Sequence, residues 1–316
     1  MSEERDALVG LAADIFKGRT SNEQLAAIER SQERWDTALW KELAEAGLVG
    51  IAIPEQYGGA GLGLAELALL LEQQGKYLAM VPLWETAIAA LLIAEGGTEE
   101  QKAAWLPRIA SGEVTLSVSP AFDGSDGLVS GPFDALVVVD GSSVVLADAF
   151  EVEPVESTTH QTAYDVTSAT GAQLAVAPSR VQDLVRIALA AVQLGVADAG
   201  TREAAVHLTG REQFGRALAT FQATQQQLAD CYCDVQAMRA TVGQAVFTQD
   251  PRDVDVAVWW ATDAGERIQH TVQHVHGGLG ADITYPVHRR LLWTMRTNAL
   301  LGGPSRQLVR LGSRLV

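Results

Sequence analysis

The stretch GREQFGRALATFQATQQQLAD, residues 210–230, breaks a long helical pattern and then starts another helix. An ordinary turn between two helices needs a glycine and little else. Here Arg211, Gln213 and Phe214 stand at the break, and Phe221 opens the next helical run. A planar cation, an amide and two aromatic faces within a few residues suit a ligand that carries both phosphate and a flat ring.

A second glycine-rich break is HGGLGADITYPVHRR, residues 276–290. Gly277 and Gly278 let the backbone approach a ligand closely, as a phosphate or a ring edge requires, although a plain turn between helices also explains them. The stretch GGAGLG, residues 58–63, follows no strand-to-helix pattern. It is therefore not a dinucleotide-binding fingerprint, and an ordinary turn is favoured there.

The composition bounds the class of protein. The chain has 316 residues, of which 47% are hydrophobic, and a formal net charge of −16. This length predicts one to three domains with a large core. An acidic surface repels nucleic acid and anionic membranes, so neither is an expected partner. The first residues lack the pattern of a signal peptide, and no apolar run reaches the ~18 residues of a membrane span.

The cysteines and histidines predict no metal site. Cys231 and Cys233 lie two residues apart in a helical stretch and therefore point to different faces, and a chain without a disulfide framework fits a reducing, cytoplasmic location. Four histidines gather near the C-terminus: His270, His274, His276 and His288. His270 and His274 are one helical turn apart, but no glutamate lies between them as in a zinc-protease helix. No Gly-x-Ser-x-Gly motif occurs, so nucleophilic hydrolysis is not expected.

The first third of the chain has helical periodicity. In RWDTALWKELAEAG, Leu39 and Leu43 fall on one face, and a glycine ends the run. Thr98 and Gln101 have the spacing of a capping box at the start of another helix. These patterns predict a helical domain over residues 1–112.

The pattern changes after residue 112. Short segments rich in β-branched residues and bounded by Gly, Pro, Asp and Ser predict strands. They are EVTLSVS (113–119), DALVVVD (134–140), SSVVLAD (142–148), FEVEPVE (150–156) and QLAVAPS (173–179). We therefore predict a mainly α protein with a small β domain over 113–178 and a helical domain over 179–316. Because alternating βαβ units are missing, a Rossmann core is disfavoured.

Five stretches, in this order, resemble the flavin-dependent acyl-CoA dehydrogenase family. They are LAEAGLVGIAIPEQYGGAGLG, GTEEQKAAWLPRIASGE, GSD at 124–126, REQFGRALATFQATQQQLAD and HGGLGADITYP. The resemblance covers nearly the whole chain and implies an N-terminal helical domain, a middle β domain and a C-terminal four-helix bundle. It also implies FAD, an acyl-CoA substrate and an electron-transfer flavoprotein or a similar electron acceptor.

In that family the Arg-x-Gln-Phe-Gly segment grips the ADP arm of an FAD that is bound mainly in a neighbouring subunit. By resemblance, Arg211 would pair with the pyrophosphate through its planar fork, and Gln213 would hydrogen-bond nearby. Phe214 and Phe221 would pack on the adenine side.

The same resemblance assigns the glycine-rich break to this arm of the cofactor. The backbone of Gly277 and Gly278 would contact it. The family usually has a glutamine three residues before the first of these glycines, and here that position is His274.

The reaction of the family needs a carboxylate that removes an α-proton from the acyl-CoA while flavin accepts the β-hydride. Most members carry this glutamate just before a Gly-Thr near the C-terminus, where this chain has Ala299, Leu300, Leu301 and Gly302. A minority carry it just before an arginine early in the helix after the β domain, where this chain has Val185-Arg186. Asp183 is two residues away and turned to another face. We therefore predict no catalytic residue in this chain.

The predicted β domain is short for the family and lacks the Gly-x-Lys-x-Trp-Ile-Thr segment that lines the flavin ring. Both losses resemble the smaller, base-lacking subunits of actinobacterial heterotetrameric acyl-CoA dehydrogenases, which act on CoA thioesters of steroid side chains. On that resemblance a second, base-carrying subunit supplies the base, the flavin-ring pocket and most of the substrate tunnel. This chain supplies the clamp on the ADP arm, so that FAD is shared between the two.

Two alternatives stay open on the sequence. The chain could be a self-sufficient homo-oligomeric flavoenzyme with an unusual base, for which the candidates are Asp183, Glu203, Glu212 and Asp282. It could instead be a structural protein on this fold that binds no flavin. The intact Arg-x-Gln-Phe-Gly cluster argues against that second alternative, because a pure scaffold has no need of it.

Overall fold

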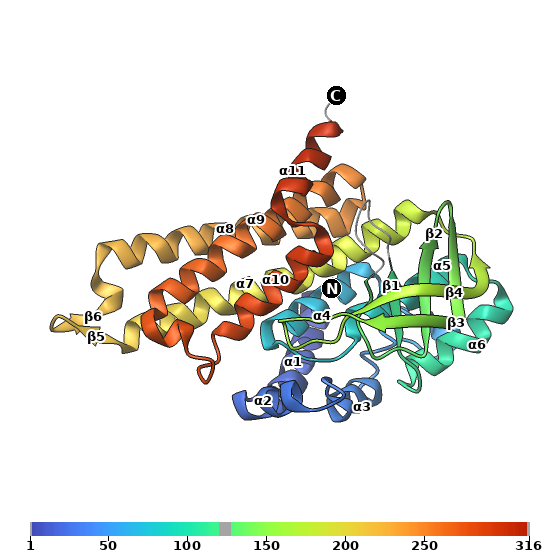
Figure 1. Cartoon of the computed structure of the whole chain (residues 1–316), viewed down its shortest axis with the longest axis horizontal. Helices are drawn as coiled ribbons and strands as arrows, with labels where there is room; N and C mark the ends of the chain where they lie inside the picture. The colour runs from blue at the N-terminus through green and yellow to red at the C-terminus, as the bar shows by residue number, and fades with distance from the viewer. Residues whose placement is uncertain (1, 120–127, 315–316) are drawn as a thin grey trace. The chain divides into compact units, whose positions relative to one another are not determined.

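The computed structural model describes residues 2–119 and 128–314 (Figure 1). The chain divides into two compact units: Met1–Gln74 with Ala79–Ala188, and Gly75–Leu78 with Leu189–Val316. The Gly-Ser-Asp motif at 124–126 lies outside the described residues. Apart from Gly75–Leu78, the helices before residue 112 and the strands after it belong to the same unit. The predicted domain boundaries at 112/113 and 178/179 stay predictions.

Six α-helices and a short 3₁₀ helix begin the first unit. They are α1 (Ser2–Arg19), α2 (Asn22–Arg30), α3 (Thr37–Glu45), η1 (Glu55–Tyr57), α4 (Leu64–Tyr77), α5 (Leu83–Gly96) and α6 (Glu99–Ala110). Leu39 and Leu43 of α3 are fully buried, and Gly47 follows the helix with a φ of +73°, as the pattern predicted. The capping box of Thr98 and Gln101 is confirmed, since each side chain accepts the other residue's N–H, at 3.3 and 2.7 Å.

Four strands form one sheet in the order β1–β2–β3–β4 (Figure 1). They are β1 (Leu116–Ser119), β2 (Ala135–Asp140), β3 (Ser143–Pro154) and β4 (Tyr164–Leu174). The first pair is parallel and the other two are antiparallel. One face buries Val129, Leu136 and Ala147, with the Phe133 ring packed edge-on against Tyr164. The fold class predicted from the sequence, mainly α with a small β region, is confirmed.

Two of the predicted strands differ in the structure. One strand, β3, covers most of the two segments predicted at 142–148 and 150–156. Where a break between them was predicted, the pairing of β3 with β4 shifts in register between Ala147 and Ala149. The last strand was predicted at 173–179 but runs over Tyr164–Leu174. Most of β4 is exposed or half-buried and rich in Ser, Thr, Gly and Ala, so that it lacks the apolar alternation that marks a strand in the sequence.

The second unit is built from long helices. The chain continues through α7 (Pro178–Gly210), β5 (Glu212–Gln213), β6 (Arg216–Ala217), η2 (Leu218–Thr220), α8 (Gln222–Thr248), α9 (Pro251–His276), η3 (Gly277–Ala281), α10 (His288–Leu301) and α11 (Gly303–Ser313). Helices α8, α10 and α11 all pack against α9. Helix α7 belongs to the first unit up to Ala188 and to the second unit from Leu189.

By length and composition, α7 is the one helix among the described residues that could cross a membrane. Its most apolar 18-residue window has a mean hydropathy of 1.4, and 94% of that window is buried within the protein. Such burial is typical of the core helix of a folded domain.

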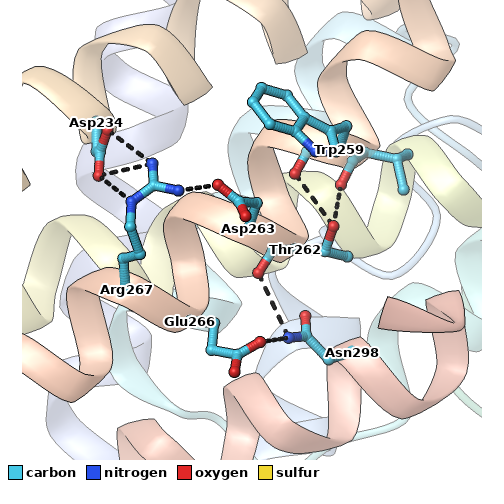
Figure 2. Close-up of polar contacts among 8 residues, drawn as sticks. Asp234, Trp259, Thr262, Asp263, Glu266, Arg267 and Asn298 are labelled. Atoms are coloured by element: carbon cyan, nitrogen blue, oxygen red, sulfur yellow. Dashed lines mark hydrogen bonds and ion pairs between the residues drawn. The ribbon is translucent and has the colours of Figure 1, made fainter. Parts of the chain in front are cut away.

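Polar side chains tie the helices of the second unit together. Figure 2 shows Asn298 of α10 donating its amide to Glu266 of α9 at 3.2 Å. Asp255 of α9 is completely buried, forms an ion pair with Arg310 at 3.2 Å and accepts a hydrogen bond from Arg314, and these contacts fasten α11 to the bundle. A buried carboxylate is tolerated there because two guanidinium groups neutralise it.

Candidate functional site

A short β-hairpin, β5 and β6, stands at the break that the sequence marked between α7 and α8 (Figure 1). Its two turn residues, Phe214 and Gly215, have φ values of +55° and +78°. Two successive positive φ angles are typical of a type I′ turn, whose twist matches that of the strands. The N–H of Leu218 donates to the carbonyl of Arg211 at 2.8 Å and closes the base of the hairpin. The sequence predicted the break but not the hairpin.

The aromatic side chains of the hairpin differ in what they face. Phe214 is 90% exposed, and its ring meets Phe221 edge-on with centroids 6.2 Å apart. The guanidinium of Arg216 lies 4.0 Å from the centre of the Phe221 ring and covers one face of it. Gln213 is exposed and donates its amide to the carbonyl of Glu212 at 2.7 Å. Since a bulky residue at positive φ costs about 1–3 kcal/mol, the exposed Phe214 ring favours a binding role.

The charge of Arg211 has no counter-ion among the residues that the structure describes. Its side chain is exposed and forms no hydrogen bond or ion pair with any residue among 2–119 and 128–314. Arg267 of α9 shows the opposite case: Figure 2 shows its guanidinium between Asp234, at 3.1 Å, and Asp263. Arg211 is therefore free to bind an anion with its planar fork.

The glycine-rich turn after α9 exposes its backbone. Gly277 has a φ of +58°, and a Cβ added to Gly277 or Gly278 would meet nothing within 4 Å. Gly280 is different, because its Cβ would lie 2.5 Å from the carbonyl oxygen of Gln273. His274 is exposed in the last turn of α9, where its carbonyl accepts the N–H of Gly277. Neither backbone conformation nor packing therefore requires glycine at position 278, and the open backbone there suits close approach by a ligand.

A pair of stacked histidines joins these two segments. The rings of His207, in the last turn of α7, and His276, at the end of α9, have centroids 4.2 Å apart and planes 29° apart. Arg211 comes one helical turn after His207, and its N–H donates to the carbonyl of His207 at 2.9 Å. Gly277 directly follows His276. The structure therefore brings the hairpin and the glycine-rich turn to the same end of the bundle.

The two positions where the family carries its base hold no carboxylate. Val185 and Arg186 are each 1% exposed, and Arg186 lies 3.6 Å from Asp183 on the same helix. At the other position, Leu301 is buried and Gly302 ends α10 with a φ of +83°. Both segments are occupied by packing side chains or by a helix end.

The remaining candidate bases are bound to other groups or exposed. Glu203 forms a two-point ion pair with Arg290, whose Nε lies 2.7 Å from Oε2. Asp282 accepts the backbone N–H and the hydroxyl of Thr284, and these hydrogen bonds hold the pKa of its carboxyl below the usual range. Glu212 lies on the exposed β5 strand. A general base needs a pKa near the working pH, and the lowered pKa of Asp282 does not suit that role.

The two cysteines differ in burial. Cys231 is buried, which raises the pKa of its thiol, whereas Cys233 is exposed, as their spacing predicted. Both line a cavity of 380 Å³ on α8 and α9, to which no predicted site residue contributes. Within residues 2–119 and 128–314, no three His, Cys, Asp or Glu side chains group so as to hold a metal ion.

Three residues of this end of the bundle were missed by the sequence reading. Arg216 covers the Phe221 ring, His207 stacks on His276, and Tyr285 packs on His276 with ring centroids 5.6 Å apart. Arg216 could have been found, since it follows the glycine of the same motif. The histidine pair joins positions 69 residues apart and leaves no local pattern.

Comparison with known proteins agrees with the fold. Residues 2–113 match the family description "Acyl-CoA dehydrogenase, N-terminal domain", and residues 176–314 match "Acyl-CoA dehydrogenase, C-terminal domain". The chain is 32% identical to acyl-CoA dehydrogenase FadE27 of Mycobacterium tuberculosis, and the similarity covers 99% of this chain and 97% of that protein.

Solved structures give the same result. A chain of the steroid ACAD Tcur3481–Tcur3483 superimposes with a TM-score of 0.90 at 41% identity, over 99% of this chain and 97% of that one. A chain of the ChsE4–ChsE5 complex from Mycobacterium tuberculosis superimposes with a TM-score of 0.89 at 31% identity, over 100% and 98%. The chain belongs to the acyl-CoA dehydrogenase family of flavin-dependent oxidoreductases.

Proposed function

We propose that this chain is one subunit of a heteromeric acyl-CoA dehydrogenase, in which it clamps the ADP arm of an FAD held mainly by a second subunit. The observation that carries the proposal is the exposed hairpin: Arg211, which has no counter-ion in the described part of the chain, stands beside an exposed Phe214 at positive φ. No contact among the described residues requires that combination. A diphosphate and an adenine presented by a neighbouring subunit would satisfy both side chains.

The residues present fit the arm of the cofactor. Arg211 would bind the pyrophosphate bidentately, Gln213 has a free amide oxygen for a sugar hydroxyl, and Phe214 offers a flat face to adenine. The open backbone of Gly277 and Gly278 would allow the phosphates to come within hydrogen-bonding distance. FAD, when bound, supplies the acceptor of the hydride from the acyl-CoA.

Proton removal is assigned to the partner. The family positions hold Val185 and the segment Ala299–Gly302 instead of a carboxylate, and the other acids of the second unit are ion-paired, hydrogen-bonded or exposed. A self-sufficient homo-oligomer would need one of those acids to work as the base. No observation favours this alternative.

Two related complexes support the heteromeric assembly and the substrate. The ChsE4–ChsE5 structure is a complex of two named chains, and the protein at 41% identity is called a steroid ACAD. We therefore extend the proposal to a CoA thioester of a steroid side chain as the substrate. A redox partner such as an electron-transfer flavoprotein would reoxidise the flavin.

Co-purification tests the assembly. The chain is produced alone and together with a base-carrying acyl-CoA dehydrogenase encoded beside it, and the native mass and visible spectrum of each sample are recorded. We expect a colourless lone chain and a yellow complex with fewer flavins than chains. A lone chain that binds one flavin per subunit and oxidises an acyl-CoA would refute the proposal.

The role of Arg211 is tested by FAD content. In the complex, Arg211→Ala is expected to weaken FAD binding by about 10- to 150-fold, since charge-assisted bonds to phosphate contribute ~1.5–3 kcal/mol. Arg252→Ala, which removes another exposed arginine of the same unit, is the matched control and should leave the FAD content of the complex as it is. Equal FAD content in both variants would contradict the clamp.

A further inference from the structure

The stacked histidines have a defined arrangement of protons and packing. His276 is 5% exposed, and its Nδ1 lies 2.7 Å from the carbonyl oxygen of Val272. Because a carbonyl oxygen only accepts hydrogen bonds, Nδ1 carries the proton and donates it. One side of the ring stacks on His207, and Tyr285 packs against it at a centroid distance of 5.6 Å. The ring of His276 is therefore fixed from three sides.

Each ring is attached to one half of the proposed clamp. His207 lies one turn before Arg211, and the backbone hydrogen bond between them carries the helix into the hairpin. His276 is the last residue of α9, and the turn of Gly277 and Gly278 follows it directly. A change in the distance between the rings would change the distance between the two halves.

The surroundings of His207 disfavour a positive charge. Burial, the neighbouring His276 and the cation of Arg211 all lower the pKa of His207 below its usual range, with burial as the largest cause. The nearest acid on its own helix, Glu203, is bonded to Arg290. On the side of Tyr285, Asp282 is bonded to Thr284.

His288, from the same side, has its Nδ1 2.7 Å from the carbonyl oxygen of Tyr285. The two side chains that act electrostatically on His207 are thus His276 and the cationic Arg211. Protonation of His207 would add a positive charge against Arg211 and His276.

We propose that His207 and His276 are positioning residues that hold the Arg211 hairpin and the Gly277–Gly278 turn together as one clamp, and that the clamp is intact while the ring of His207 is uncharged. This rests on the proposed function, because it assigns both halves to the same cofactor arm. The contribution of a histidine whose pKa is lowered by folding is fully present above the ordinary value of about 6.5 and is lost as the pH falls below it. Protonation of His207 should therefore disfavour the arrangement that holds the two halves of the clamp together, and we expect FAD binding to weaken on acidification.

The test measures FAD binding to the deflavinated complex by flavin fluorescence at pH 7.5 and 5.8. We expect wild-type Kd to rise at least about fivefold between the two values, at the lower end of typical coupling between sites. His207→Phe keeps a ring that stacks but cannot ionise, so its Kd should change less than about twofold. His207→Ala removes the ring and should weaken binding at both pH values. His270→Ala, which removes an exposed histidine of α9, should retain the wild-type response to pH.

A second readout does not depend on the cofactor. In the chain labelled at its histidine rings, NMR should show His207 titrating below the ordinary range, and His207→Ala should shift the signals of His276 and Tyr285. This measurement also reports whether each variant is folded. A His207 that titrates at or above the ordinary value would overturn the inference.

The outcomes separate the two proposals. If Arg211→Ala binds FAD like the wild type, the proposed function is wrong. If Arg211→Ala binds weakly but His207→Phe keeps the full response to pH, or His207→Ala binds as tightly as the wild type, then the positioning role alone is wrong.

Discussion

The two glycine-rich turns of this chain, at 58–63 and at 277–280, look alike in the sequence and differ in what explains them. In the first, Gly58 and Gly61 have φ values of +84° and +65°, and a Cβ on Gly59 would lie 2.5 Å from the Cβ of Ile53. In the second, the positive φ of Gly277 and the tight contact of Gly280 with Gln273 require glycine. Gly278 has neither a positive φ nor an atom within 4 Å of an added Cβ. An open glycine at a turn beside the exposed Arg211 suits close approach by a ligand.

The arginines also differ in whether the chain supplies an acidic partner. Arg310 and Arg314 are bonded to the buried Asp255, and Arg267 is held by two aspartates, whereas Arg211 faces solvent. The difference between the two glycine-rich turns is thus matched by a difference in ion pairing among the arginines. Gly278 and Arg211, which no contact of the described residues explains, both lie at the end of the bundle that holds the stacked histidines.

The largest effect is expected for Gly59→Ala. The added Cβ overlaps Ile53, and the turn has no room to move because the carbonyls of Gly50 and Ile53 also border it. We expect a loss of about 3 kcal/mol or more in the free energy of unfolding and a melting temperature lower by about 6 °C or more. Gly10→Ala, at an open helical position of the same unit, is the control and should be neutral or stabilising. An unchanged melting temperature for Gly59→Ala would break the comparison.

Asp255→Asn should have the next largest effect. It leaves Arg310 and Arg314 without their shared carboxylate, and we expect about 2–3 kcal/mol of destabilisation, because both arginines are one-third exposed and partly hydrated. Hydrogen exchange should be faster in α11. Arg211→Ala, measured in parallel, should change the free energy of unfolding by less than about 0.5 kcal/mol. Similar destabilisation by the two variants would contradict the division of the arginines.

Gly278→Ala should affect binding and leave folding alone. Its Cβ meets no atom of the chain, so the melting temperature should stay within about 1 °C of the wild type. In the complex, the methyl group would hold the backbone away from the phosphates, and FAD affinity should fall about tenfold, or about 1.4 kcal/mol. Gly243→Ala, another open position on α8, should change neither quantity.

The smallest effect is expected for Phe214→Asn. Asparagine is favoured before glycine in a type I′ turn, so the substitution should relieve strain and raise the free energy of unfolding by about 0.5–1 kcal/mol. At the same time it removes the exposed ring and should weaken FAD binding in the complex. Chemical denaturation and FAD titration together check the two opposite signs. A destabilised variant would mean that Phe214 packs within the chain.

How far the sequence predicted the fold depended on local signals. The buried pair Leu39 and Leu43 and the capping box at Thr98 are patterns within one helix, and the structure confirms them. The predicted position of strand β4 was wrong because the strand is held by pairing with β3 rather than by an apolar face. Pairing of this kind leaves no pattern in the sequence of the strand itself.

The candidate site shows the same limit. The motif itself marked Arg211 and Phe214, but the hairpin was missed because its turn carries Phe where Asn or Gly is usual. In the sequence, His276 stands among the four histidines that gather near the C-terminus. Its actual neighbour, His207, is distant along the chain, and tertiary packing alone brings the two rings together.

Helix α7 has a consequence for how such a chain can be divided or exchanged. Its first residues, up to Ala188, belong to one unit and its remaining two-thirds to the other, without a break in the helix. A cut after β4 takes from the first unit a helical segment with the buried residues Val181, Leu184 and Val185. A cut at Ala188 leaves the second unit to begin in the middle of a helix. A chimaera that grafts the bundle of one relative onto the body of another must therefore transfer α7 whole, together with matched partners for both of its ends.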